Sequence, residues 1–149
     1  MSTINFYSHR NKQTGFLSNF FGAPFVLAGE TWPSSEHYFQ GMKTGDPKRR
    51  ELIRHAATAS KAAKMGRARK ATKIRPDWEQ VKIKTMLDAC LAKFTQDPKL
   101  EKLLVATGDA ILIEHTTRDS YWGDGGNGSG NNMLGKVLME VRTILLTPD

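Results

Sequence analysis

The segment WPSSEHYFQGMK, residues 32–43, is the most informative part of the chain, because it combines a helix start with two chemically different helix faces. Pro33 suits the first turn of a helix, and Ser34 or Ser35 can cap the exposed N–H groups there. At about 100° per residue, the polar and apolar side chains of such a helix point in opposite directions. The polar stripe holds Glu36, Gln40 and Lys43, and the apolar side holds Tyr38, Phe39 and Met42. The pattern predicts a helix with one face free for chemistry, although an ordinary solvated face fits the same spacing.

A second informative segment, RDSYWGDGGNGSGNN at residues 118–132, precedes an apolar helical pattern. Loops of this length are uncommon in compact domains unless they bind a ligand or are disordered, and Gly, Ser and Asn also make flexible linkers. Against a linker, the run contains two aromatic residues and two aspartates, and it leads into a helix N-terminus whose free N–H groups favour phosphate. We therefore predict a ligand loop that closes over its ligand.

Length and composition favour a single domain over residues 1–149. A chain of this size can bury one core, and no linker or composition break divides it. Since neither a signal-peptide pattern nor a membrane-length apolar run is present, the expected location is the cytoplasm. The one cysteine, Cys90, falls in an apolar helical pattern and is expected to be a core residue.

The expected elements alternate short strands with longer helices. Asp46-Pro47 and Asp97-Pro98 are cap-and-first-turn pairs that open helices, and Gly108 ends the second of these. Strands are predicted at 3–7, 25–28 and 110–113, and helices from 34, at 48–57, at 60–72, at 77–96, from 98 and from 134. The predicted fold class is α+β, mainly helical, with a small β-sheet.

The net charge of +7 is concentrated partly between residues 61 and 75. The cluster consists of Lys61, Lys64, Arg67, Arg69, Lys70, Lys73 and Arg75. Such a run is usually a solvated face, but near a cleft it would attract phosphate-bearing substrates or nucleic acid. The sequence alone does not separate these uses.

The four histidines and one cysteine do not form a metal-binding pattern. No two histidines have the i, i+4 spacing of a helical zinc pair, and the usual thiolate sets need more cysteines. We expect neither a metal nor another cofactor.

Several short strings resemble, in the same order, the NADAR family of N-glycosidases. They are FLSNF at 16–20, WPSSEHYFQ at 32–40 with Lys43, Gly66-Arg67, Lys93-Phe94, LIE at 112–114, Asp119 with Trp122-Gly123, and GNNMLG at 130–135. The ordered match covers nearly the whole chain. The resemblance implies the NADAR fold and hydrolysis of an N-glycosidic bond. The substrate would be either a phosphoribosylamino-pyrimidine intermediate of riboflavin synthesis or ADP-ribose attached to guanine.

The chemistry of C–N glycosidic cleavage points to carboxylates in the matching segments. Positive charge develops on the sugar, so a carboxylate near the anomeric carbon stabilises the transition state or activates water. We expect Glu36 and Asp119 to be catalytic. Lys43 has two open roles, because its ammonium can hold a phosphate, or its desolvated amine can attack the ring-opened sugar and form a Schiff base.

The expected substrate contacts come from both informative segments and from two isolated positions. Arg67 can grip a phosphate through two parallel hydrogen bonds, and Trp122 or Trp32 can stack on the base. Asn19 and Gln40 are candidates for the ribose hydroxyls. The full expected substrate-binding set is Asn19, Trp32, Gln40, Arg67, Trp122, Gly123, Asp124 and Asn131.

Two functions of other classes use some of the same residues. A non-catalytic ADP-ribose or NAD reader needs the aromatic and basic groups but tolerates loss of the carboxylates, and a nucleic-acid-binding module depends on the basic run and on low salt. The carboxylates favour catalysis. The expected partner is a phosphorylated ribosyl or ADP-ribosyl substrate, with nucleic acid entering as an ADP-ribosylated substrate, and no membrane. The oligomeric state is not predicted.

Overall fold

The computed structural model describes residues 2–147 of the chain. It divides into two compact units. The central unit is continuous and covers residues 22–93, whereas the terminal unit joins the segment before residue 22 to the segment after residue 93. Within the described residues, no helix is both long enough and apolar enough to cross a membrane.

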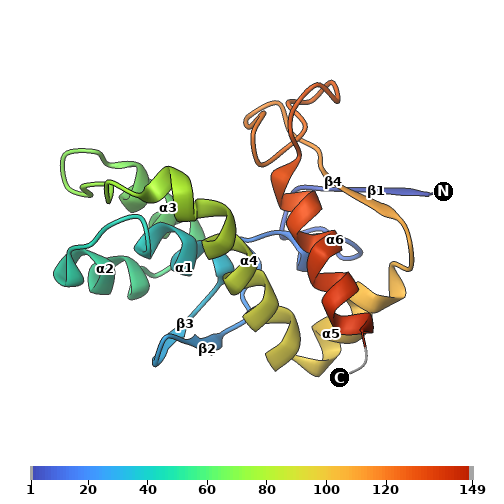
Figure 1. Cartoon of the computed structure of the whole chain (residues 1–149), viewed down its shortest axis with the longest axis horizontal. Coiled ribbons are helices and arrows are strands. Elements are labelled where there is room, and N and C mark those ends of the chain that lie inside the picture. The colour runs from blue at the N-terminus through green and yellow to red at the C-terminus, as the bar shows by residue number, and fades with distance from the viewer. Residues whose placement is uncertain (1, 148–149) are drawn as a thin grey trace. The chain divides into compact units, whose positions relative to one another are not determined.

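The central unit consists of a β-hairpin and a group of helices (Figure 1). Strands β2 (Phe25–Leu27) and β3 (Glu30–Trp32) pair in antiparallel fashion. They are followed by α1 (Ser35–Gly41), α2 (Pro47–Arg54), α3 (Ala59–Arg67) and most of α4 (Trp78–Gln96). Side chains cap the starts of the three short helices, since Ser34, Asp46 and Thr58 each accept a backbone N–H of the first turn.

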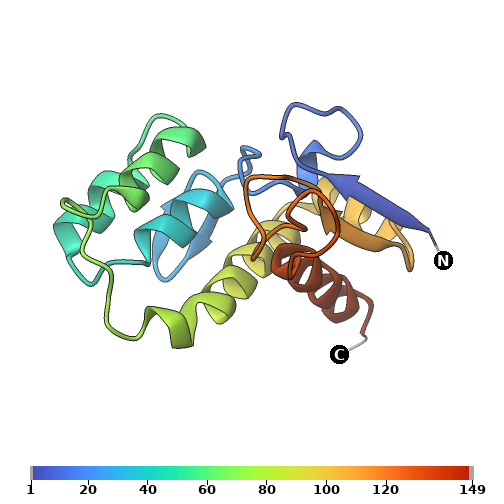
Figure 2. The ribbon, with the colours of Figure 1, turned by 90° about the horizontal axis from the view of Figure 1, so that it is seen from above.

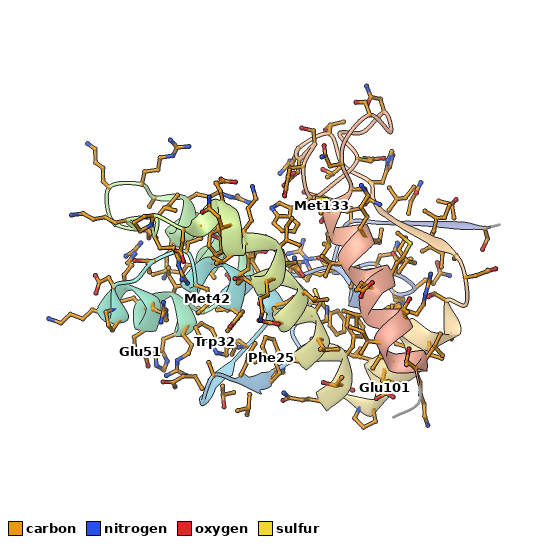
Figure 3. The ribbon with its side chains drawn as sticks, viewed as in Figure 1. Phe25, Trp32, Met42, Glu51, Glu101 and Met133 are labelled. Carbon is orange, nitrogen blue, oxygen red and sulfur yellow. The ribbon has the colours of Figure 1, made fainter. Side chains whose placement is uncertain are left out.

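The core of the central unit joins the hairpin to α1 and α4. Phe25 and Trp32 are both buried there with Tyr38, and Met42 packs against the cluster (Figure 3). The Trp32 and Tyr38 rings meet edge to face, with their centroids 5.0 Å apart. Trp32 is only 1% exposed, and its indole N–H donates to the Leu27 carbonyl over 3.1 Å.

The terminal unit is built around a parallel strand pair. Strand β1 (Thr3–Phe6) pairs with β4 (Ile111–Glu114), with Thr3 opposite Ile111 (Figure 2). The unit also contains the short 3₁₀ helix η1 (Gly15–Leu17), the end of α4, α5 (Pro98–Ala106) and α6 (Met133–Leu146). Helix α6 packs on β4 and α5.

The start of α6 is fixed to β4 by one side chain. The Asn132 amide accepts the Glu114 N–H and donates to the Leu112 carbonyl, both over 2.9 Å. A Cβ atom on Gly135 would lie 2.0 Å from that carbonyl oxygen, so only glycine allows this close approach. The Asn132 side chain therefore makes hydrogen bonds to β4 of the kind that a neighbouring strand would make at its edge.

The predicted fold class and most of the predicted elements are confirmed. The structure differs in three places. Residues 2–147 contain two separate two-stranded sheets instead of one small sheet, because β2 pairs with the unpredicted strand β3. Helix α3 ends at Arg67 and not near Thr72, and β4 is buried only at Leu112.

Candidate functional site

Helix α1 is buried on every side, so its polar stripe is not a solvated face. All seven of its residues are buried, including Glu36 at 6% exposure and Gln40 at 2%. The helix packs against α2, α3 and β3. Glu36 and Gln40 lie side by side and Tyr38 enters the core, as predicted. The prediction of a free polar face is wrong, because neighbouring elements cover that face. Lys43 lies beyond the helix, which ends at Gly41.

The Glu36 carboxylate is held by the side chain one turn further along α1. Gln40 Nε2 donates to Glu36 Oε1 over 2.7 Å. Within the described residues, Gln40 Oε1 is buried without a hydrogen-bond partner. We expected Gln40 to bind ribose hydroxyls, whereas the structure directs its amide group to the carboxylate.

Lys43 interacts electrostatically with both Glu36 and Arg67, the predicted phosphate-binding residue. Its side chain is partly buried, and its Nζ lies 5.5 Å from the centroid of the Phe39 ring, a cation–π distance. Burial lowers the pKa of Lys43, the nearby Glu36 carboxylate raises it, and the Arg67 guanidinium lowers it. Lys43 is thus within electrostatic reach of both residues. Glu36, Gln40, Lys43 and Arg67 form what we call the central cluster.

The C-terminal end of α3, which carries Arg67, is held by two residues that the sequence did not single out. The Thr72 hydroxyl donates to the Met65 carbonyl over 2.7 Å, and the Arg49 guanidinium donates to Thr72 Oγ1 over 2.8 Å. A second guanidinium N–H reaches the same Met65 carbonyl over 3.2 Å. These bonds fold the chain back at the end of α3 and present the exposed Arg67 from a fixed turn.

Two other residues of the conspicuous 32–43 segment have packing partners in the structure. The buried Trp32 ring presents no exposed face on which a base could stack. His37 is also buried, and its ring nitrogens face Ser34 Oγ at 2.7 Å and the Ala56 carbonyl at 3.0 Å. Burial lowers the pKa of His37, which favours its neutral form. Trp32 therefore packs against α1 through Tyr38, and His37 links α1 to the Ala56 carbonyl after α2.

The glycine-rich loop lies between β4 and α6 (Figure 1). It is hydrogen-bonded to the start of the helix that follows it. The N–H groups of Met133 and Leu134 donate to the carbonyls of Tyr121 and Trp122, each over 3.0 Å. The expectation that these N–H groups are free to bind phosphate is therefore wrong, because the loop itself uses them. Closure of the loop over a ligand stays a prediction.

The two loop aspartates bind backbone N–H groups. Asp119 Oδ1 accepts the N–H groups of Tyr121 and Trp122, over 2.9 Å and 2.8 Å. Asp124 Oδ1 accepts those of Thr116 and Gly126, over 3.0 Å and 2.8 Å. Its second oxygen, Oδ2, lies 2.8 Å from His115 Nδ1. Asp124 is therefore a central support of the loop.

We expect Asp124→Asn to lower the Tm at pH 7. The His115 ring and two backbone N–H groups lower the pKa of Asp124 from 3.8 to about 2. A carboxylate with a lowered pKa contributes stability above its ordinary pKa and loses it as the pH falls through the lowered value. The Tm difference from the wild type should therefore shrink between pH 4 and pH 2. The exposed Asp109→Asn serves as a control, and an equal effect there would contradict the assignment.

The predicted site residues fall into both units. Glu36, Lys43, Gln40, Arg67 and Trp32 belong to the central unit. The remaining predicted residues belong to the terminal unit and are Asn19, Asp119, Trp122, Gly123, Asp124 and Asn131. Their roles in catalysis or binding stay predictions. No group of three or more His, Cys, Asp or Glu side chains among residues 2–147 is arranged to hold a metal ion.

Comparison with known proteins gives a consistent result over almost the whole chain. The model of the NADAR domain matches residues 5–146. The chain is 51% identical to N-glycosidase YbiA of Shigella flexneri over 139 residues, which cover 93% of this chain and 86% of that protein. It is 40% identical to a riboflavin biosynthesis protein of Vibrio vulnificus over 93% of this chain, but only 37% of that longer protein.

A solved structure supports the same assignment. The NMR structure of the Escherichia coli protein YbiA matches with a TM-score of 0.88 and 49% sequence identity, over 97% of this chain and 84% of that chain. Together with the family match, these similarities show that the chain belongs to the NADAR domain family and is an N-glycosidase.

Proposed function

We propose that the enzyme hydrolyses the C–N glycosidic bond of phosphoribosylamino-pyrimidines and that the central cluster carries the reaction. The main supporting observation is the buried Glu36 carboxylate, held at 2.7 Å by Gln40 and electrostatically coupled to Lys43. The similarity to a protein named for riboflavin biosynthesis supports this substrate class.

Glu36 has the properties required of a carboxylate in glycosidic cleavage. Because it is removed from bulk water and held in one orientation, it interacts strongly with charge that develops nearby. In this proposal it stabilises the positive charge on the sugar and moves protons between the amine groups and water. Arg67 binds the phosphate, since an exposed guanidinium can form two parallel hydrogen bonds with it.

Lys43 acts as the nucleophile in this mechanism. Burial lowers its pKa, so more of the neutral amine is present at a given pH than in an exposed lysine. The ring-opened substrate is an imine at the sugar C1. The Lys43 amine adds to C1, and the aminopyrimidine leaves with a proton, which gives a lysine imine. Water then adds to C1, releasing the free lysine amine and the aldehyde form of ribose phosphate.

The test is a product assay by mass spectrometry. Purified protein, without added metal, should release the aminopyrimidine and ribose phosphate from a phosphoribosylamino-pyrimidine, and EDTA should not abolish the release. ADP-ribosyl-guanine is the second substrate in the assay. Release of guanine from it alone would replace the proposed substrate class, and release from neither substrate by folded protein would contradict the proposal.

A further inference from the structure

Gly66 brings the backbone of α3 into contact with a side chain of α1. A Cβ atom added to Gly66 would lie 1.9 Å from Gln40 Oε1 and 2.7 Å from Gln40 Cδ. Both distances are far shorter than a van der Waals contact. The Gln40 amide therefore occupies the space that any side chain at position 66 would fill.

The backbone of α3 does not itself require glycine at this position. Gly66 lies within the helix and has no positive φ angle. Glycine inside a helix is less stable than alanine, because it loses more conformational freedom on folding. Helix formation alone therefore gives no reason for glycine at this position.

The Gln40 amide is also unfavourable for folding. Its Oε1 is buried and has no hydrogen-bond partner among the described residues, and an unpaired buried acceptor destabilises the folded state. Exchanging the amide oxygen and nitrogen would place an oxygen against the Glu36 carboxylate, so the charge of Glu36 fixes the orientation. The contribution of this amide is its N–H bond to Glu36.

We propose that Gly66 is a positioning residue, which acts on Glu36 through Gln40. Its missing side chain leaves room for one placement of the amide, and this placement holds the carboxylate in one orientation. Both unfavourable features, the helical glycine and the unpaired oxygen, are explained by this preorganisation. The inference rests on the proposed function, in which Glu36 is the catalytic carboxylate.

The first test is Gln40→Met, which keeps the length of the side chain and removes its polar atoms. The kcat should fall by about 10- to 100-fold, since a small misplacement of a reacting group has effects of this size. KM should change little. Two opposing effects act on the Tm, because the unpaired oxygen is removed but the N–H bond to the buried Glu36 carboxylate is lost as well. The readout that separates positioning from a merely structural role is therefore the fall in kcat at nearly constant KM in folded protein.

The second test is a double-mutant cycle between Gly66→Ala and Gln40→Ala. Gly66→Ala should lower kcat in the wild-type background and much less in the Gln40→Ala background, because the displaced amide is then absent. The added methyl group meets Gln40 Cβ at 2.9 Å in both backgrounds, so the cycle removes this packing effect. Gly45→Ala is the matched control, since nothing lies within 4 Å of its added Cβ.

The outcomes separate this inference from the proposed function. Wild-type kcat in Gln40→Met would overturn the inference, as would equal losses from Gly66→Ala in both backgrounds. An insoluble Gly66→Ala protein would also overturn it and assign Gly66 to helix packing. If Glu36→Gln is inactive while Gln40→Met is fully active, only this inference fails. If Glu36→Gln is fully active, the catalytic assignment of Glu36 fails.

Discussion

Glu36→Gln should lower kcat by about 100-fold or more while leaving the Tm nearly unchanged. The substitution removes the charge at almost constant volume, and Gln40 Nε2 can still donate to the new amide oxygen at the position of Glu36 Oε1. The substitution removes the desolvation cost of the buried charge together with its attraction to Lys43, and because these two effects oppose each other the domain should stay folded. Steady-state kinetics and a thermal melt on the same preparation measure the two effects.

Glu79→Gln is a suitable control for this experiment. Glu79 is exposed on α4, where it pairs with Lys82, and surface ion pairs contribute little to stability. The control should keep both its activity and its Tm. A Glu36→Gln enzyme with wild-type turnover would remove Glu36 from the mechanism.

Replacement of Lys43 should have an effect of similar or greater size, and the choice of residue separates its two roles. Lys43→Arg keeps a positive charge for a phosphate but removes the nucleophilic amine. If the amine forms a Schiff base, Lys43→Arg should lose activity nearly as completely as Lys43→Ala. Borohydride should trap a sugar adduct on the wild-type enzyme and on neither variant. An active Lys43→Arg enzyme without an adduct would assign Lys43 to phosphate binding. The exposed Lys48→Ala is the control for loss of a lysine in this unit.

The pH profile gives an independent measurement of the Lys43 role. Because burial lowers the pKa of Lys43 below its ordinary value of 10.5, the nucleophilic route should become faster with rising pH and level off below pH 10.5. A phosphate-binding ammonium would give the opposite slope. Glu36 raises the pKa of Lys43, so any residual activity of Glu36→Gln should level off at a still lower pH.

The sequence predicted those features that depend on neighbouring residues. Asp46-Pro47 and Asp97-Pro98 open helices as expected, because an aspartate side chain and a proline complete a first turn locally. The i, i+4 spacing correctly placed Gln40 beside Glu36. Each of these interactions is made within about one helical turn.

Features that depend on distant packing were missed. Strand β3 has no apolar alternation. The hairpin turn places Ala28 at a φ of 55°, which is uncommon for alanine and is not predicted from the sequence. Helix α3 ends early because Thr72 folds back onto the Met65 carbonyl. Spacing gave the direction of the Gln40 side chain but not its burial, which depends on the approach of Gly66 from another helix. The available sequence signal for this close approach was Gly66, a glycine within a predicted basic helix.

The parallel pairing of β1 with β4 has a consequence for the order in which the chain folds. The partners of residues 3–6, at 111–114, are made more than a hundred residues after them. The continuous central unit is complete by residue 93, so Glu36, Gln40, Lys43 and Arg67 can be assembled while β1 still has no partner strand. Closing such a long loop is entropically costly and slow. Formation of the β1–β4 ladder is therefore expected to be a late step in folding, after the central unit has formed.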